Sequence, residues 1–180
     1  MNASRPDILL ACPDAAEIEG LRRVGVDIMA LATPWAMKVA HGYRAADNRF
    51  ESYVSGERWL AFERLDFTDI VFWHRPTNRL TTWCGRTFAL GEEVIDDPAT
   101  YSFDCALNIF ADPLEWLRAR RDGIVVLPSQ WHRAFERLRD APRIAIAESL
   151  LPTYRRFMKP AHMPELSIIP SKMPPARRAA

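Results

Sequence analysis

The sequence predicts an α/β or α+β fold whose C-terminal half is a small parallel β-α-β-α-β unit. Three short apolar runs have the length of buried strands: Gly123 to Leu127, Arg143 to Ala147 and Leu166 to Ile169. Between them, residues 129–140 and 148–158 carry apolar side chains at helical spacing. Strands that alternate with helices are typical of a parallel sheet, which places ligand sites beyond the C-terminal ends of its strands.

A further helix is expected directly before this unit. Asp112 is a suitable N-cap, Pro113 suits the first helical position, and Glu115 can complete a capping box. Gly123 is expected to end the helix. The last turn holds three cations that complement the negative end of the helix dipole, Arg118, Arg120 and Arg121.

An antiparallel aromatic hairpin is expected over residues 69–84. Asp69 to His74 and Arg79 to Cys84 are the two strands, and Arg75-Pro-Thr-Asn78 has the composition of a tight turn. Residues 58–63 form another expected strand. Nearer the N-terminus, residues 7–12 suit either a strand or the lead-in to the helix expected from Pro13 to Gly25.

The length of 180 residues suits one domain. We expect a single α/β domain over residues 1–170. Residues 1–110 form its mixed half with the hairpin, and residues 111–170 form its β-α-β-α-β half. Residues 171–180 are expected to form a basic, proline-rich tail.

Charge and cysteine content limit the classes of function. The net charge of +1 gives no global signal for nucleic acid or membrane. Residues 1–152 hold 18 basic and 22 acidic residues, a net charge of −4, whereas residues 153–180 hold six and one, a net charge of +5. Three cysteines without a CxxC motif favour a reducing compartment. Without a signal-peptide pattern or an apolar run that could span a membrane, we expect a cytoplasmic protein that does not bind membranes.

The common motifs of α/β enzymes are missing. The chain has seven glycines and no P-loop, GxGxxG or GxSxG pattern. Nucleotide-dependent enzymes and ordinary α/β hydrolases are therefore not expected, and no cofactor is expected.

The strand ends of the predicted parallel unit hold one candidate site. Gln130, Glu148 and Ser149 follow two neighbouring predicted strands, where a carboxylate can act as a general base or metal ligand. The alternative is that Glu148 or Ser149 caps the following helix.

The segment from Asp112 to Leu127, followed by Arg143-Ile-Ala-Ile-Ala-Glu148, resembles the strand-then-glutamate segment of Toprim-type modules in mobile-element primase-like proteins. This resemblance covers residues 112–160 and implies an active or degenerate enzyme of nucleic-acid metabolism that uses Glu148 with a divalent metal. Such a site also needs a downstream Asp-x-Asp pair. After Glu148 the only acid is Glu165, and Ser149 replaces the expected glycine. These two departures from the family pattern imply that a chain related to this family has lost the metal chemistry and kept only the scaffold.

Two further groups of polar residues have ordinary explanations. The acidic segment lacks the spacing of a calcium loop and is expected to be a solvated charge run; it comprises Glu92, Glu93, Asp96 and Asp97, with Asp104 nearby. The isolated histidines and cysteines match no zinc or nucleophile spacing; they are His41, His74, His132, Cys84 and Cys105. No metal site is expected.

A basic and aromatic surface is the remaining candidate for binding. Aromatic side chains on a sheet with flanking arginines can contact a partner or stack bases. The candidate residues are Trp73, Arg75, Arg79 and Trp83 in the hairpin, and Arg155, Arg156, Lys159, Arg177 and Arg178 near the C-terminus. The alternative is an apolar hairpin face that packs on the core.

These observations favour a non-catalytic cytoplasmic binding or interaction protein, such as an accessory factor of a mobile element. A protein is the expected partner, and nucleic acid, contacted through the basic tail, is the alternative.

Overall fold

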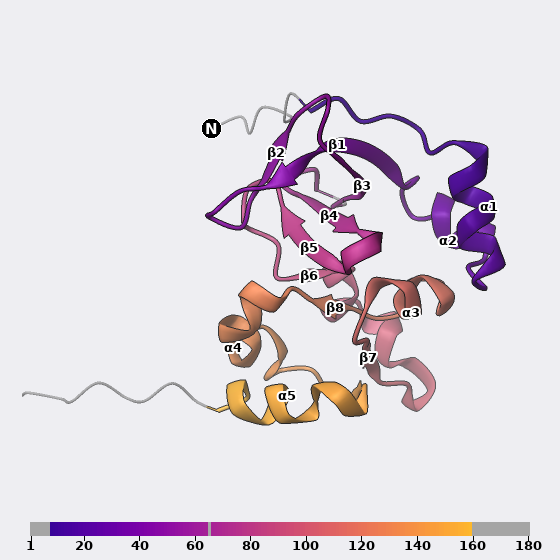
Figure 1. Ribbon diagram of the computed structural model, residues 1–180. Coiled ribbons are helices and arrows are strands. Elements are labelled where there is room, and N and C mark those ends of the chain that lie inside the picture. Colours follow the sequence, from indigo (N-terminus) through magenta and orange to yellow (C-terminus); the bar gives the residue numbers. More distant parts are fainter. Residues whose placement is uncertain (1–7, 65, 160–180) are drawn as a thin grey trace, which may run out of the picture.

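The structure is a computed structural model that describes residues 8–64 and 66–159 (Figure 1). Its strands are β1 Lys38–Arg44, β2 Phe50–Ser52, β3 Glu57–Glu63, β4 Ile70–His74, β5 Arg79–Thr82, β6 Ala89–Leu90, β7 Leu107–Ile109, β8 Val125–Val126 and β9 Ile144–Ile146. Its α-helices are α1 Ala15–Arg23, α2 Ile28–Ala32, α3 Pro113–Arg118, α4 Ala134–Leu138 and α5 Leu151–Phe157. Five 3-10 helices complete the described part: η1 Arg75–Thr77, η2 Glu92–Ile95, η3 Pro98–Asp104, η4 Pro128–Arg133 and η5 Glu148–Leu150.

A curled antiparallel sheet dominates the fold. Its five strands run in the order β2-β1-β3-β4-β5. An isolated bridge between Arg49 and Thr82 brings the two outer strands together, and Thr81 donates a hydrogen bond to the Asn48 carbonyl beside it. The sheet is therefore bent toward a barrel, as the purple and magenta strands of Figure 1 show.

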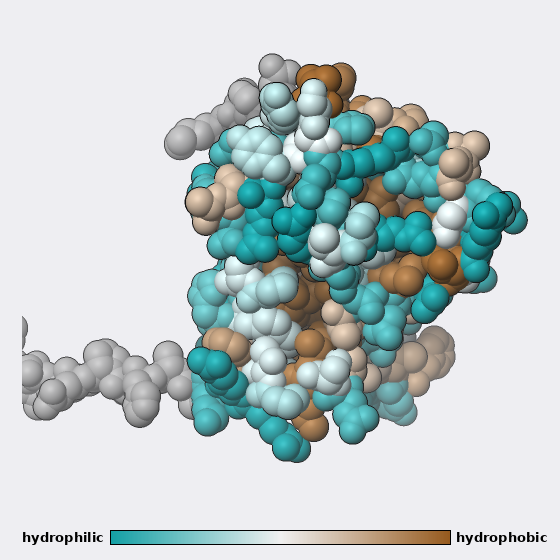
Figure 2. Space-filling view, in the orientation of Figure 1, coloured by the Kyte–Doolittle hydropathy of each residue, from teal (hydrophilic) through white to brown (hydrophobic). Residues whose placement is uncertain are grey.

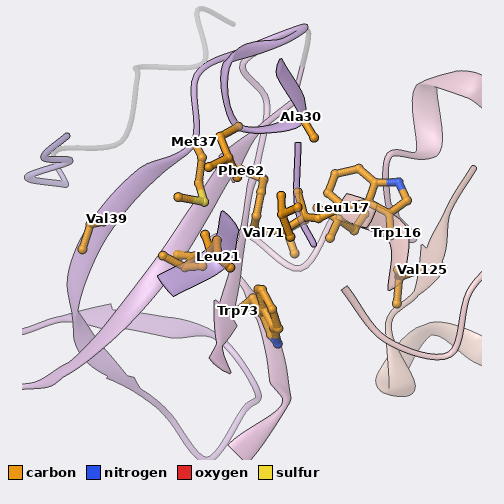
Figure 3. Packing of buried hydrophobic residues seen from close by; sticks show 14 residues of the cluster. Leu21, Ala30, Met37, Val39, Phe62, Val71, Trp73, Trp116, Leu117 and Val125 are labelled. Atoms are coloured by element: carbon orange, nitrogen blue, oxygen red, sulfur yellow. The ribbon is translucent and has the colours of Figure 1, made fainter. Parts of the chain in front are cut away.

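Both faces of the sheet are buried. On the inside of the curl, the Phe50 ring stacks on Phe72 with centroids 3.8 Å apart, and Trp59 contacts Phe50 edge-on. The other face packs against the helices, where Phe62 and Trp73 join Trp116 of α3 in a second cluster (Figure 3). The two layers of apolar side chains explain why β3 and β4 are nearly continuous apolar runs.

The expected hairpin is confirmed by β4, the turn at η1 and β5. Asn78 adopts the left-handed conformation at the end of the turn, with φ of 52°. The start of α3 is also confirmed, because the Asp112 carboxylate accepts hydrogen bonds from the Leu114 and Glu115 amides at 2.8 and 3.0 Å.

The predicted parallel β-α-β-α-β half is wrong. The first predicted strand survives as β8, which pairs antiparallel with β6. The second survives as β9, which pairs parallel with β7 rather than with β8. Ile124, directly before β8, forms an isolated parallel bridge with Ile109 of β7. The third predicted strand, Leu166 to Ile169, lies outside the described residues. An apolar run has the same periodicity in either strand direction, so the sequence pattern cannot specify its partner.

The two predicted helices of this half are shorter than expected. Residues 128–133 form the 3-10 helix η4 before α4, and residues 148–150 form η5 before α5. Their apolar sides build a third core cluster around Phe88, Leu107, Ile109, Trp131 and Leu138. In the part of the chain that the structure describes, no helix is long and apolar enough to cross a membrane.

Candidate binding surface

The end of α3 places two consecutive arginines on either side of α2. Arg120 and Arg121 both have left-handed backbones, with φ of 55° and 63°. Arg120 forms an ion pair of 2.8 Å with Asp27, the N-cap of α2. Arg121 donates a hydrogen bond of 3.0 Å from Nη1 to the carbonyl of Trp35, just after α2. Left-handed backbone costs a non-glycine residue about 1–2 kcal/mol, and such strain is concentrated at functional sites.

The Arg121 guanidinium lies against two aromatic rings. Its Cζ atom is 5.3 Å from the Phe62 ring centroid and 5.4 Å from that of Trp116. The Trp116 ring is held in turn by a hydrogen bond of 2.7 Å from Nε1 to the Gly123 carbonyl. The cation therefore lies on a rigid aromatic support.

One edge of this guanidinium has no partner among the residues that the structure describes. Nε and Nη2 of Arg121 are buried and donate no hydrogen bond to any described residue. These two nitrogens form the edge with which arginine binds a carboxylate or phosphate through two parallel hydrogen bonds. Burial lowers the pKa of Arg121 to about 10, and the Glu93 carboxylate opposes this shift. The group therefore stays charged at neutral pH, and its burial is only partly compensated.

The free edge belongs to a narrow cleft, which we call the arginine–aromatic cleft. Its enclosed space is about 20 Å³, roughly the room that one oxygen atom or water molecule needs. The lining comprises Pro34, Trp35, Phe62, Glu63, Arg64, Val71, Thr87, Ala89, Leu90, Gly91, Glu93, Trp116 and Arg121. One of these rings, Trp35, is 40 % exposed and packs on Phe67, which is 46 % exposed, with centroids 5.3 Å apart.

A second, open groove lies on the other side of α2, and we call it the arginine groove. It has a volume of about 620 Å³, and its lining residues are Glu19, Arg22, Arg23, Gly25, Val26, Asp27, Ile28, Arg118 and Arg120. Each arginine also has a structural role. Arg118 donates to the Val24 carbonyl at 2.6 Å, for example. Figure 2 shows hydrophobic atoms at the surface beside α1 and α2, among hydrophilic ones. Ile28 and Met29 of α2 are about half exposed.

The hairpin residues predicted to bind a partner are mostly engaged within the fold. Trp73 is only 2 % exposed, and its Nε1 donates to Asn78 at 2.9 Å, so this ring cannot contact a partner. Arg79 pairs with Glu57 at 2.8 Å and lies over the buried Trp59 ring. Arg75 is exposed and reaches the Gly20 carbonyl at 3.4 Å. Because both strands have buried faces, the hairpin forms part of the core.

Of the two predicted hairpin aromatics, Trp83 is the one that remains partly accessible. It packs against the inner cluster of the sheet and borders an open groove of about 440 Å³ beside β2. Arg155, Arg156 and Lys159 are exposed at the end of α5, where Arg156 lies over Phe157. Arg177 and Arg178 lie outside the described residues. The structure does not bring Arg155, Arg156 or Lys159 to the hairpin.

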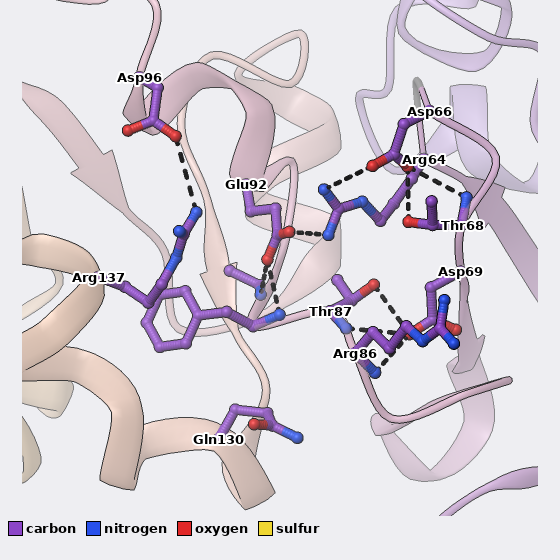
Figure 4. A network of polar contacts seen from close by, with 12 residues as sticks. Arg64, Asp66, Thr68, Asp69, Arg86, Thr87, Glu92, Asp96, Gln130 and Arg137 are labelled. Carbon is purple, nitrogen blue, oxygen red and sulfur yellow. Dashed lines mark hydrogen bonds and ion pairs between the residues drawn. The ribbon is translucent and has the colours of Figure 1, made fainter. Parts of the chain in front are cut away.

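The acidic segment is a solvated charge run at Asp96, Asp97 and Asp104, which are exposed, but not at Glu92. Glu92 is 4 % exposed, accepts backbone hydrogen bonds from Phe88 and Ala89, and forms an ion pair with Arg64 (Figure 4). Asp96 is exposed and lies near Arg137. Within residues 8–64 and 66–159, no group of three or more His, Cys, Asp or Glu side chains could hold a metal ion.

The strand-end candidates do not form a site together. Glu148 and Ser149 are exposed on η5, whereas Gln130 lies on η4 and accepts a hydrogen bond of 3.4 Å from Arg133. His74 is buried and shares a hydrogen bond of 2.6 Å with Thr77. All three cysteines are free.

Sequence reasoning missed Arg121, Trp35 and Phe67. Arg121 was expected to complement a helix dipole, and no local pattern indicates that the backbone turns its side chain against rings from β3 and α3. Comparisons with protein-family models, curated proteins and solved structures found no match, so the Toprim-type resemblance of residues 112–160 stays untested.

Proposed function

We propose that this chain is a non-catalytic binding protein that takes a carboxylate of a protein partner at the arginine–aromatic cleft. The carboxylate can be an acidic side chain or a chain terminus. The observation that carries the proposal is the buried, unpartnered Nε–Nη2 edge of Arg121. A partner carboxylate would supply the two hydrogen bonds that this edge lacks in the described part of the chain.

The energetics support a carboxylate ligand. A hydrogen bond to a charged group contributes about 1.5–3 kcal/mol, and a buried donor without a partner costs a comparable amount. A bound carboxylate would therefore replace the hydrogen bonds to water that the Arg121 guanidinium loses when it is buried. The cleft has room for one carboxylate oxygen, with the rest of the group at the mouth beside Trp35.

The rim of the cleft supports a protein as the source of this carboxylate. Trp35 and Phe67 present partly exposed rings that contact each other at a tilt of 51°, and tryptophan, tyrosine and arginine dominate the energetics of protein interfaces. Ile28 and Met29 extend the apolar surface along α2. We include a cytoplasmic location in the proposal, which the three free cysteines support.

The test follows the Arg121 side chain directly by NMR. Acetate is titrated into the protein at constant ionic strength, with chloride as the reference, while the Arg121 Nε–H resonance is recorded. A saturable shift is expected. Arg121→Lys keeps the charge but loses the bidentate edge, so acetate should no longer cause saturable shifts in the amide resonances around the cleft.

Arg120→Lys is the matched control, because Arg120 has the same left-handed backbone and lies outside the cleft. It should leave the acetate response intact. A linear response without saturation, or equal responses in both variants, would refute the proposal. Capture from lysate with and without nuclease identifies the partner class; loss of all capture after nuclease would replace a protein by nucleic acid.

A further inference from the structure

The short helix α2 presents an apolar face to solvent. All five of its residues are apolar, in the order Ile-Met-Ala-Leu-Ala. Ala30 and Leu31 are buried, whereas Ile28, Met29 and Ala32 are exposed. Residues three and four apart lie on one side of a helix, so these three exposed residues form a continuous patch, which we call the α2 stripe. A helix that is apolar all round is normally covered, and an exposed apolar patch is typical of an interaction surface.

The α2 stripe joins the arginine groove to the arginine–aromatic cleft. Asp27, directly before α2, lines the groove, and Trp35, just after α2, lines the cleft. Arg120 pairs with Asp27, and the next residue, Arg121, donates to the Trp35 carbonyl. Two cationic sites therefore lie at opposite ends of one apolar stripe.

The arginine groove carries positive charge that its own carboxylates do not balance. Its lining holds four arginines and two carboxylates, a net charge of +2. Arg22 and Arg23 share one carboxylate, that of Glu19, each at 3.4 Å. Their side chains are 60 % and 77 % exposed. Exposed ion pairs of this kind contribute less than about 1 kcal/mol, so an incoming anion can replace them.

We propose that the partner binds through a segment in which apolar side chains separate two acidic ones. One carboxylate binds the free edge of Arg121, the apolar side chains cover the α2 stripe, and the second carboxylate lies in the arginine groove. This arrangement rests on the proposed function, which supplies the first carboxylate.

The length of α2 sets the spacing of the two acidic positions. Five helical residues rise about 7.5 Å, and the three residues from Thr33 to Trp35 add at most about 10 Å. An extended peptide rises about 3.3 Å per residue. The two acidic positions therefore lie about three to five residues apart in the partner.

A peptide fits this surface better than a nucleic-acid strand. A strand carries one phosphate per nucleotide, so its charges would lie against the α2 stripe as well as at its two ends. Burial of a charge against an apolar surface without a partner is unfavourable. A peptide can place apolar side chains on the stripe and its charges at the ends.

A capped pentapeptide, titrated into the full chain, tests this partner class. The peptide has glutamate at both ends and leucine, alanine and leucine between them, so its sequence is the same in both directions. NMR titration of the amide resonances at constant ionic strength gives its dissociation constant. Replacement of one glutamate by glutamine should raise this constant about three- to tenfold, because one cationic site then lacks its carboxylate.

The groove is tested by Arg23→Gln. This variant should raise the dissociation constant of the two-glutamate peptide about threefold. It should leave that of the one-glutamate peptide unchanged, because the remaining glutamate binds at the cleft. Arg139→Gln is the matched control and should change neither constant. Arg139 is also exposed at the end of a helix, and its Nε also forms an ion pair of 3.4 Å, with Asp140.

The stripe is tested by Met29→Gln. Met29 is 55 % exposed, and the loss of its contact should raise the dissociation constants of both peptides about threefold. Val54→Gln is the control, because Val54 is an exposed apolar residue outside the stripe, the groove and the cleft. An acetate response that persists in Arg23→Gln and Met29→Gln shows that both variants keep the fold and the cleft.

Equal affinity for the two peptides would overturn the proposal, as would equal effects of Arg23→Gln and Arg139→Gln. If acetate still binds at Arg121 in that case, the proposed function stands and only the two-acid segment is wrong. If acetate does not bind there, the proposed function itself fails. Displacement of the peptide by an oligonucleotide of eight thymidines, with the same dependence on Arg23, would assign the groove to nucleic acid and also overturn the proposal.

Discussion

The buried carboxylate of Asp69 accepts a hydrogen bond of 2.9 Å from the backbone amide of Thr87, eighteen residues along the chain. The same carboxylate accepts the amides of Cys84 and Arg86, both at 2.8 Å, so one side chain ties the segment after β5 to the start of β4 (Figure 4). The fold of this segment therefore depends on a single charged acceptor.

We expect Asp69→Asn to lower the free energy of unfolding by about 3 kcal/mol. An amide replaces one acceptor oxygen with a donor, which faces backbone N–H groups and leaves them unpaired in a buried site. Urea denaturation measures the change. Asp96→Asn, at an exposed carboxylate, is the control and should shift stability by less than about 0.5 kcal/mol. A loss of similar size in both variants would contradict this role of Asp69.

Thiol labelling should distinguish the three cysteines. Burial, followed by the nearby Asp69 charge, raises the pKa of the Cys84 thiol. The thiolate is the reactive form, so at pH 8 Cys84 should react with iodoacetamide more slowly than the exposed Cys12 and Cys105. Its rate should keep rising at pH values above the ordinary thiol pKa. Peptide mass spectrometry over a pH series measures the three rates; equal rates at pH 8 would contradict the prediction.

The raised pKa of the Cys84 thiol also makes the free energy of unfolding depend on pH. An acid whose pKa is higher in the folded state binds its proton more tightly there, so its contribution to stability is complete below the unfolded pKa and is lost as pH rises through the folded value. Cys84→Ser should therefore reduce the loss of stability above pH 9, close to the ordinary thiol pKa. Urea denaturation of both chains at pH 7 and pH 10 measures this difference, and equal losses would contradict it.

Local sequence signals predicted local structure. The turn at Arg75-Pro-Thr-Asn78 and the cap at Asp112 each depend on a few adjacent residues, and both are confirmed. Strand partners could not be predicted in the same way, because β6 and β7 are supplied from outside the expected parallel unit. The arginine–aromatic cleft depends on Trp35, Phe62 and Arg121, which are far apart in the sequence. Arg121 has a left-handed backbone, which a sequence usually signals by a glycine, and this position holds an arginine instead.

Glu93 should act against ligand binding at the cleft. Its charge stabilises the protonated Arg121 but repels an incoming carboxylate. We therefore expect Glu93→Gln to lower the dissociation constant for acetate about three- to tenfold, the size of one nearby charge in a partly exposed site. Glu115→Gln on the exposed side of α3 is the control. Weaker binding by Glu93→Gln would mean that Glu93 helps to form the site instead.

Phe103 should lower the stability of the folded chain. Asparagine adopts a left-handed backbone more readily than phenylalanine, and the fully exposed ring makes no compensating burial in the monomer. Phe103→Asn should therefore raise the free energy of unfolding by about 0.5–1 kcal/mol. Urea denaturation of both chains measures the change. A lower free energy of unfolding in Phe103→Asn would show that the phenylalanine ring stabilises the fold, and would contradict the prediction.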